Sequence, residues 1–129
     1  MRVLYVDDDR INSLLFAEAC RFASGVEIET AATGAEALEM APRWAPQVLV
    51  IDLHLPDTNG YALLPALRAA LHAPALPAYL CTADDPALVA EPARAAGFNG
   101  CWPKPVDVQV ILAELARHGA APGTEAPSA

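Results

Sequence analysis

The sequence has 129 residues, which is enough for one domain with a buried core and too short for two domains of ordinary size. Hydrophobic residues make up 54% and charged residues 19%, a balance typical of a globular protein and not of a disordered chain. Eight basic against sixteen acidic side chains give a formal net charge of -8, which disfavours direct binding to nucleic acid or to an anionic membrane.

No uninterrupted apolar run approaches the roughly 18–20 residues of a membrane span, and the first residues lack the long apolar segment of a secretory signal. The cysteines, Cys20, Cys81 and Cys101, are an odd number without CxxC spacing. This pattern fits a reduced compartment better than a disulfide scaffold or a zinc site, so we expect a cytoplasmic protein.

Short apolar runs alternate along the chain with longer stretches of helical periodicity. The runs predict strands, of which 26–30 is exposed on one face and 48–51 is covered on both. In chain order the expected elements are strand 3–6, helix 11–22, strand 26–30, helix 35–44, strand 48–51, helix 61–71, strand 76–81, a helix starting at 84–86, strand 98–102 and helix 106–118.

Local signals refine the expected helices. The apolar stripe of the first helix is expected to face the core, and Asp9 is expected to cap that helix. Thr58 or Asn59 can cap the third helix, which either begins late or kinks at Pro65. Pro92 inside the fourth helix predicts an element that is short, bent or mobile. The stripe of the first helix consists of Ile11, Leu14, Leu15, Ala19 and Phe22.

Five strand–helix units with short connections predict an α/β fold, a single doubly wound parallel sheet with helices on both faces. In such folds the functional crevice lies beyond the carboxyl ends of the strands. Charged and hydroxyl side chains stand at four of these ends, and we expect them to converge on one edge of the sheet. They are Asp7 and Asp8 after the first strand, Asp52 after the third, Thr82 after the fourth and Lys104 after the fifth.

Such a cluster of acids needs a counterion. Carboxylates about 5 Å apart repel by roughly 3 kcal/mol per pair at an effective dielectric constant near 20. Mg²⁺ offsets this repulsion, because it prefers oxygen ligands and needs only one or two direct carboxylates. Lys104 is the only lysine, and its compact ammonium suits one phosphoryl oxygen, while the Thr82 hydroxyl can donate to another. The expected chemistry is transfer of a phosphoryl group to a carboxylate.

Four short motifs, in this order and spacing, resemble the receiver domain of two-component response regulators and hybrid histidine kinases. The resemblance runs from about residue 2 to residue 118 and implies a flavodoxin-like three-layer sandwich with five strands in the order 2-1-3-4-5. The motifs are Tyr-Val-Asp-Asp-Asp at 5–9, Ile-Asp-Leu-His-Leu-Pro-Asp-Thr-Asn-Gly at 51–60, Cys-Thr-Ala at 81–83 and Lys-Pro at 104–105.

The resemblance also implies a role for each matched residue. Asp52 accepts the phosphoryl group, Lys104 pairs with that group, and Thr82 moves toward it on activation. The donor is a phosphohistidine on a histidine kinase or a histidine phosphotransfer protein, and the outcome is a change in contacts with a downstream protein target. The implied ligands for Mg²⁺ or Mn²⁺ are Asp7, Asp8, Asp52 and the backbone carbonyl of His54.

One position departs from the family pattern. Receivers usually place an aromatic residue three positions before the lysine, and its rotation accompanies the movement of the threonine. Cys101 stands there, with Trp102 beside it, which leaves the common threonine–aromatic switch in question. Phosphorylation itself does not require that switch.

Three alternative functions would each require a different set of residues. A pseudo-receiver that binds partners without phosphorylation would lack acidic residues or the lysine, and all of them are present. A phosphatase that forms an aspartyl phosphate would carry a second carboxylate two residues after the nucleophile, where this chain has His54. A flavin-binding module would need a phosphate-cradling loop after the first strand, where this chain has three aspartates that would repel a phosphate. We therefore expect a switch that phosphorylates and dephosphorylates itself, and no turnover enzyme.

The receiver domain is expected to occupy residues 1–118, followed by a flexible tail over residues 119–129. That tail has no room for a DNA-binding or catalytic output domain, so the chain is either a stand-alone receiver or a piece of a larger protein. The expected partners are proteins, without direct contact to nucleic acid or membrane. A homodimer through the last two helices is left open.

Overall fold

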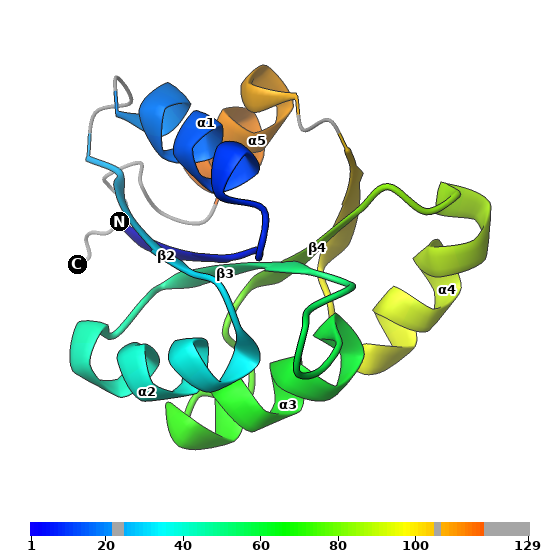
Figure 1. Cartoon of the computed structure of the whole chain (residues 1–129), viewed down its shortest axis with the longest axis horizontal. Helices are drawn as coiled ribbons and strands as arrows, with labels where there is room; N and C mark the ends of the chain where they lie inside the picture. The colour runs from blue at the N-terminus through cyan, green and yellow to red at the C-terminus, as the bar shows by residue number, and fades with distance from the viewer. Residues whose placement is uncertain (22–24, 105–106, 118–129) are drawn as a thin grey trace.

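Five parallel strands form the central sheet of the computed structural model, in the order β2-β1-β3-β4-β5 (Figure 1). The described residues are 1–21, 25–104 and 107–117. Helices lie on both faces of the sheet, so the predicted three-layer α/β sandwich and its strand order are confirmed. The strands are β1 (Arg2–Val6), β2 (Glu27–Ala31), β3 (Val48–Asp52), β4 (Ala78–Thr82) and β5 (Gly100–Pro103).

The helices α1 and α5 cover one face of the sheet, and α2, α3 and α4 cover the other (Figure 1). Residues 106 and 118, at the ends of the last predicted helix, and the predicted tail over 119–129 lie outside the described residues. Over the described residues, none of the helices combines the length and the apolar character needed to cross a bilayer. In chain order the helices are α1 (Arg10–Cys20), α2 (Gly34–Trp44), α3 (Gly60–Ala70), α4 (Pro86–Ala96) and α5 (Val108–Leu115).

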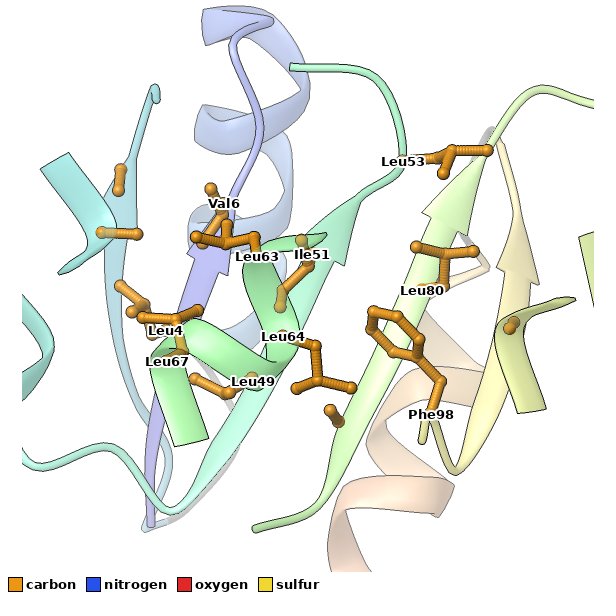
Figure 2. Close-up of a cluster of buried hydrophobic side chains, with 14 of the residues drawn as sticks. Leu4, Val6, Leu49, Ile51, Leu53, Leu63, Leu64, Leu67, Leu80 and Phe98 are labelled. Carbon is orange, nitrogen blue, oxygen red and sulfur yellow. The ribbon is translucent and has the colours of Figure 1, made fainter. Parts of the chain in front are cut away.

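The central strands are apolar because both of their faces are covered, as predicted for 48–51, where every residue is buried. Successive side chains of a strand point to opposite faces. Val3 and Tyr5 of β1 therefore pack under α1 and α5, whereas Leu4 and Val6 pack under the other three helices. Figure 2 shows this second core, whose labelled side chains are Leu4, Val6, Leu49, Ile51, Leu53, Leu63, Leu64, Leu67, Leu80 and Phe98.

A polar side chain caps the start of each of the five helices. Asp9 caps α1, Asn59 caps α3 and Asp85 caps α4, each by accepting a hydrogen bond from a backbone N–H of the first turn. The predicted cap at Asp9 is confirmed, and Asn59 is the cap of α3. This helix begins at Gly60 and contains Pro65, so it does not begin late.

Of the alternatives predicted for the fourth helix, which were a short, bent or mobile element, the first is wrong. The helix α4 has 11 residues, as many as α1, α2 or α3, and Pro92 lies inside it. Pro92 is exposed and removes one backbone hydrogen bond. Val89 and Ala93 of the same helix are buried against the sheet. Their packing outweighs the local cost of the proline.

The orientation predicted for the first helix is also wrong. Ile11, Leu14 and Leu15 are 68%, 66% and 63% exposed, although they were expected in the core. The buried residues of α1 are Ser13, Phe16 and Cys20. The ring of Phe16 stacks on Tyr5 of β1 with ring centroids 4.3 Å apart, and the Ser13 hydroxyl donates to the backbone carbonyl of Asp7 at 3.4 Å. These contacts fix the rotation of α1, and Phe22, the last residue of the predicted stripe, lies outside the described residues.

Candidate functional site

The carboxyl ends of the parallel strands bring most of the predicted site residues to one edge of the sheet. Asp7 and Asp8 directly follow β1, Asp52 is the last residue of β3, and Lys104 directly follows β5. Because β1 and β3 are neighbours with Val6 opposite Ile51, the next positions on the two chains, Asp7 and Asp52, also lie side by side. The predicted convergence of these acids is found in the structure.

Lys104 joins the two buried carboxylates of this edge. Its Nζ lies 3.0 Å from Asp7 Oδ2 and 3.1 Å from Asp52 Oδ2. The Lys104 side chain is 16% exposed, and the two carboxylates are 0% and 8% exposed. An ammonium group shared in this way cannot neutralise both carboxylates, so the buried cluster keeps an excess of negative charge.

Asp7 is held rigidly by groups of its own segment. The Tyr5 hydroxyl donates to Asp7 Oδ2 at 3.0 Å, and the backbone N–H of Asp9 donates to Asp7 Oδ1 at 2.9 Å. Burial and the charge of Asp7 both raise the pKa of Tyr5, so the phenol stays protonated and remains a donor. Asp7 is therefore a fixed acceptor at the floor of the site, with its position set before any ligand binds.

The electrostatics of Asp52 and Lys104 follow from their burial and their contact. Burial raises the pKa of Asp52 above its ordinary value, Lys104 opposes this shift, and the negative charge of Asp7 adds to it. Burial alone would lower the pKa of Lys104, but hydrogen bonds and charge from Asp7 and Asp52 outweigh it and leave that pKa raised. Lys104 is thus a permanent cation beside an acid whose ionised form is disfavoured.

The acids at this edge have a composition that suits a hard divalent cation. Asp7, Asp8 and Asp52 each offer a carboxylate oxygen, and the three oxygens lie within 4.8 Å of one another. Asp8 is exposed at the mouth of the site, whereas the other two are buried. Oxygen ligands from one or two carboxylates, completed by water, are what Mg²⁺ prefers. The donor set therefore fits the predicted ion.

The turn after β3 comes close to the backbone of Asp52. A Cβ atom on Gly60 would lie 3.1 Å from the Asp52 carbonyl oxygen and 2.7 Å from Leu80 Cδ1, so only glycine fits there. The Gly60 N–H donates to the Leu53 carbonyl at 2.9 Å. This packing holds the β3–α3 loop, which contains His54, against the end of β3.

Thr82 lies near the cluster without contacting it. It is the last residue of β4, is 1% exposed, and follows Cys81, which pairs with Asp52 in the sheet. Its Oγ1 accepts a hydrogen bond from the Asp84 N–H at 3.0 Å. The hydroxyl is therefore hydrogen-bonded to the β4–α4 loop, and the cap of α4 is Asp85.

The His54 side chain is exposed, and it has a partner that the sequence did not predict. Its Nε2 lies 2.8 Å from Asp84 Oδ2, and this contact joins the β3–α3 loop to the β4–α4 loop. The two residues are 30 positions apart, and neither belongs to a motif that links them. The only available signal was that both loops leave the same edge of the sheet.

Cys101 and Trp102 lie on opposite faces of the sheet. Cys101 packs against the core under α2, α3 and α4, whereas Trp102 is buried under α1 and α5. The Trp102 ring stacks on Tyr79 with ring centroids 4.5 Å apart and planes 6° from parallel. Trp102 therefore does not stand in for the aromatic residue that the family pattern places at position 101.

The fold and the carboxylate–lysine cluster together define a doubly wound α/β domain of the receiver class. The family model described as the response regulator receiver domain matches residues 3–116. The chain belongs to this family.

Two curated relatives illustrate where such a domain occurs. Response regulator MprA of Mycobacterium leprae is 34% identical over 115 residues, which cover 89% of this chain and 49% of the relative. The virulence sensor protein BvgS of Bordetella bronchiseptica is 33% identical over 137 aligned residues, which cover 100% of this chain and 11% of the relative. The chain thus spans about half of the first relative and about a tenth of the second.

Solved structures agree on the fold. A putative response regulator from Chloroflexus aurantiacus J-10-fl superposes with a TM-score of 0.82 at 28% identity, over 91% of this chain and 95% of that one. The chemotaxis response regulator CheY4 of Vibrio cholerae gives a TM-score of 0.78 at 28% identity, over 91% and 97% of the two chains. This chain is therefore similar to these two response regulators over nearly the whole length of their solved chains.

Proposed function

We propose that this receiver domain is the phosphoacceptor of a phosphorelay, with Asp52 taking a phosphoryl group from a phosphohistidine of a histidine kinase or a histidine phosphotransfer protein. The observation that carries the proposal is the Lys104 ammonium placed between two buried carboxylates, Asp7 and Asp52, with Asp8 beside them. A structural ion pair needs one acid for each base. The excess of acid at this edge is what a site for a cation and a phosphoryl group requires.

The transfer uses groups that are already in place. A carboxylate oxygen of Asp52 forms the new O–P bond while the P–N bond of the phosphohistidine breaks, and the imidazole leaves with the electron pair and takes a proton from solvent. Lys104, which is held 3.1 Å from Asp52, shifts its hydrogen bond to a phosphoryl oxygen. Thr82 turns its hydroxyl toward a second oxygen. Hydrolysis of the acyl phosphate by water then returns Asp52 to its carboxylate.

The cation site is part of the same proposal. Asp7, Asp8, Asp52 and the backbone carbonyl of His54 would hold Mg²⁺, or Mn²⁺ in its place. When bound, the cation supplies positive charge that offsets the phosphoryl oxygens. Asp7 contributes a carboxylate that Tyr5 and the Asp9 N–H have already oriented. The raised pKa of Asp52 is consistent with a site whose acids are not neutralised by the protein alone.

The exposed side of α1 supports a protein as the phosphoryl donor. Ile11, Leu14 and Leu15, here called the α1 apolar face, are each more than 60% exposed. The helix begins two residues after Asp8, so this face adjoins the mouth of the site. An exposed apolar patch of this kind marks a protein contact more often than a small-molecule site. A donor helix packed on α1 would bring its phosphohistidine to Asp52.

Two other functions are less well supported. A phosphatase would need an acid–base carboxylate where His54 stands, and a pseudo-receiver would have no use for the shared lysine contact. We therefore keep a self-phosphorylating and self-dephosphorylating switch, and no turnover enzyme, as the proposal. A cytoplasmic location is part of it and is supported by Cys20, Cys81 and Cys101, all of which are free thiols in the structure.

The proposal is tested by incubating the protein with acetyl phosphate and Mg²⁺ and measuring its intact mass. The expected result is a gain of one phosphoryl group that requires Mg²⁺ and is absent in Asp52→Asn. The matched control is Asp57→Asn, which removes an exposed aspartate from the same loop and is expected to keep the gain. A gain that survives Asp52→Asn would place the acceptor elsewhere, and no gain in the wild type would favour the pseudo-receiver.

A further inference from the structure

Two loops at the mouth of the site are joined by one side-chain contact, here called the His54–Asp84 clasp. His54 Nε2 lies 2.8 Å from Asp84 Oδ2, and the two side chains are 70% and 43% exposed. Exposed pairs of this kind add little to the stability of a fold, because water and salt screen them. The clasp is therefore better explained by where it lies than by how much it stabilises the domain.

Asp84 connects the clasp to a buried hydroxyl. Its backbone N–H donates to Thr82 Oγ1 at 3.0 Å, and Thr82 is 1% exposed. A hydroxyl oxygen that accepts this bond has its rotamer fixed by the position of the donor. His54, Asp84 and Thr82 thus form a chain of contacts from the phosphoacceptor loop, through the β4–α4 loop, to the end of β4.

The orientation that this chain holds is the resting one. The Thr82 hydroxyl bonds to the loop and not to Asp7, Asp52 or Lys104, which contact one another. To reach a phosphoryl group on Asp52, the hydroxyl has to turn away from the Asp84 N–H or carry the loop with it. Movement of the loop strains the clasp, since its other end is fixed by the β3–α3 loop that packs against Asp52. Rotation of the hydroxyl alone leaves the clasp intact but loses the hydrogen bond that the clasped loop donates.

We propose that the His54–Asp84 clasp is a brake that holds Thr82 in its resting orientation and so weakens the response of the domain to a phosphoryl group on Asp52. This inference rests on the function proposed above and adds a regulatory contact to it. A contact made in one state and lost in the other shifts the balance by its own free energy and no more. With Cys101 at the usual aromatic position and Trp102 stacked on the other face, the β4–α4 loop is the element on which such a brake can act.

The test measures the apparent dissociation constant of beryllofluoride, a phosphoryl mimic, in the presence of Mg²⁺ by amide shifts in NMR spectra. Asp84→Ala is expected to tighten binding about two- to fivefold, the range open to an exposed pair. His54→Ala is expected to do the same, and the double variant is expected to bind no more tightly than either single one. His54→Gln keeps a donor that reaches Asp84 and is expected to restore the wild-type value.

Control measurements distinguish an effect of the clasp from an effect on the stability of the fold or on the binding of Mg²⁺. Glu91→Ala breaks an exposed pair with Arg94 inside α4 and is expected to change nothing. The dissociation constant of Mg²⁺ alone is expected to stay the same in Asp84→Ala, and melting temperatures verify that each variant is folded. In a Thr82→Ala background, Asp84→Ala is expected to lose its effect, because the brake acts through Thr82.

The outcomes are distinct. Unchanged or weaker binding in Asp84→Ala, or an effect that persists fully without Thr82, would overturn the brake and leave the phosphoacceptor proposal intact. A wild type that shows no response to beryllofluoride and Mg²⁺ would overturn both.

Discussion

Two groups of aspartates in this domain can be compared, those at the edge of the sheet and those that contact the starts of helices. Asp57, an exposed residue of the β3–α3 loop, lies at the start of α2. It accepts hydrogen bonds from the N–H groups of Gly34 and Ala35, both at 2.9 Å. These bonds lower the pKa of Asp57. At the sheet edge, Asp52 is buried next to Asp7, and its pKa is raised. The fold therefore stabilises the ionised form of Asp57 and disfavours the ionised form of Asp52.

The difference separates acids that build the fold from acids that carry function. An aspartate at a helix start is explained completely by the N–H groups it satisfies. Nothing in the fold explains why two buried acids share one lysine at the sheet edge with a third acid beside them, because apolar or amide side chains would be less costly there. Groups that lower the stability of the fold concentrate at functional sites. Replacing them often stabilises a protein and reduces its activity.

The largest effect is expected from removing the shared cation. Lys104→Met leaves two buried carboxylates without a counterion, so the free energy of unfolding is expected to fall by about 2–3 kcal/mol. Urea unfolding without divalent ions measures this loss, and added Mg²⁺ is expected to recover part of it. Arg94→Met, in an exposed pair on α4, is the matched control and is expected to change stability by less than about 0.5 kcal/mol. Equal losses of unfolding free energy in the two variants would contradict the distinction between the buried ion pairs at the sheet edge and the exposed ion pair on α4.

In urea unfolding without divalent ions, Asp52→Asn is expected to stabilise the protein, because the amide replaces a buried acid whose ionised form is disfavoured. The sign follows from the raised folded-state pKa of Asp52: ionisation costs stability above that pKa, and the cost is relieved as the pH falls through it. The stability gap between variant and wild type is therefore expected to narrow toward acid pH. A destabilised variant, or a gap that widens as the pH falls, would contradict the account.

The α1 apolar face adjoins the sheet-edge site. Substitutions in it are expected to change the rate of phosphorylation by a protein donor and not by a small-molecule donor. Leu14→Ser with Leu15→Ser is expected to slow phosphorylation by a histidine-phosphorylated phosphotransfer domain about tenfold, a loss of about 1.4 kcal/mol. Phosphorylation by acetyl phosphate is expected to stay unchanged, because it needs no docking surface. Leu88→Ser, at a leucine on α4 that is 71% exposed, is the matched control. Slower reaction with both donors would point to a disturbed site and not to a docking face.

The smallest effect is expected at the helix start. Asp57→Asn weakens two hydrogen bonds to α2 and is expected to lower the melting temperature slightly at neutral pH. The folded-state pKa of Asp57 is lowered, so its contribution is present above its ordinary value of 3.8 and is lost as the pH falls through the folded value. Acid unfolding of the variant is therefore expected to lack this part of the pH dependence. A melting temperature raised by the substitution, as expected for Asp52→Asn, would erase the contrast.

The sequence was sufficient for the features that depend on local signals. Alternating apolar runs and helical stretches predicted the parallel sheet, and the residues at the strand ends, Asp7, Asp8, Asp52 and Lys104, were found together because parallel strands end at one edge. The same reasoning identified Asp9 as a cap.

The features that the sequence did not predict depend on contacts between distant segments. The α1 helix has two candidate buried faces, and the stacking of Phe16 on Tyr5 decides between them in favour of the less apolar one. Asp57 accepts hydrogen bonds from the first turn of a helix that starts 23 positions earlier, and His54 contacts Asp84 across 30 positions. Neither pairing leaves a periodic or local mark in the sequence.

The most direct test of the central claim, that the sheet-edge acids form a cation site and the helix-start acids do not, is a Mg²⁺ titration followed by amide shifts in NMR spectra. The account predicts saturable shifts confined to residues 7–9 and 52–54 and to Lys104, with weaker binding in Asp8→Asn. Shifts that appear equally at Asp57 and Asp85, or that never saturate, would contradict it.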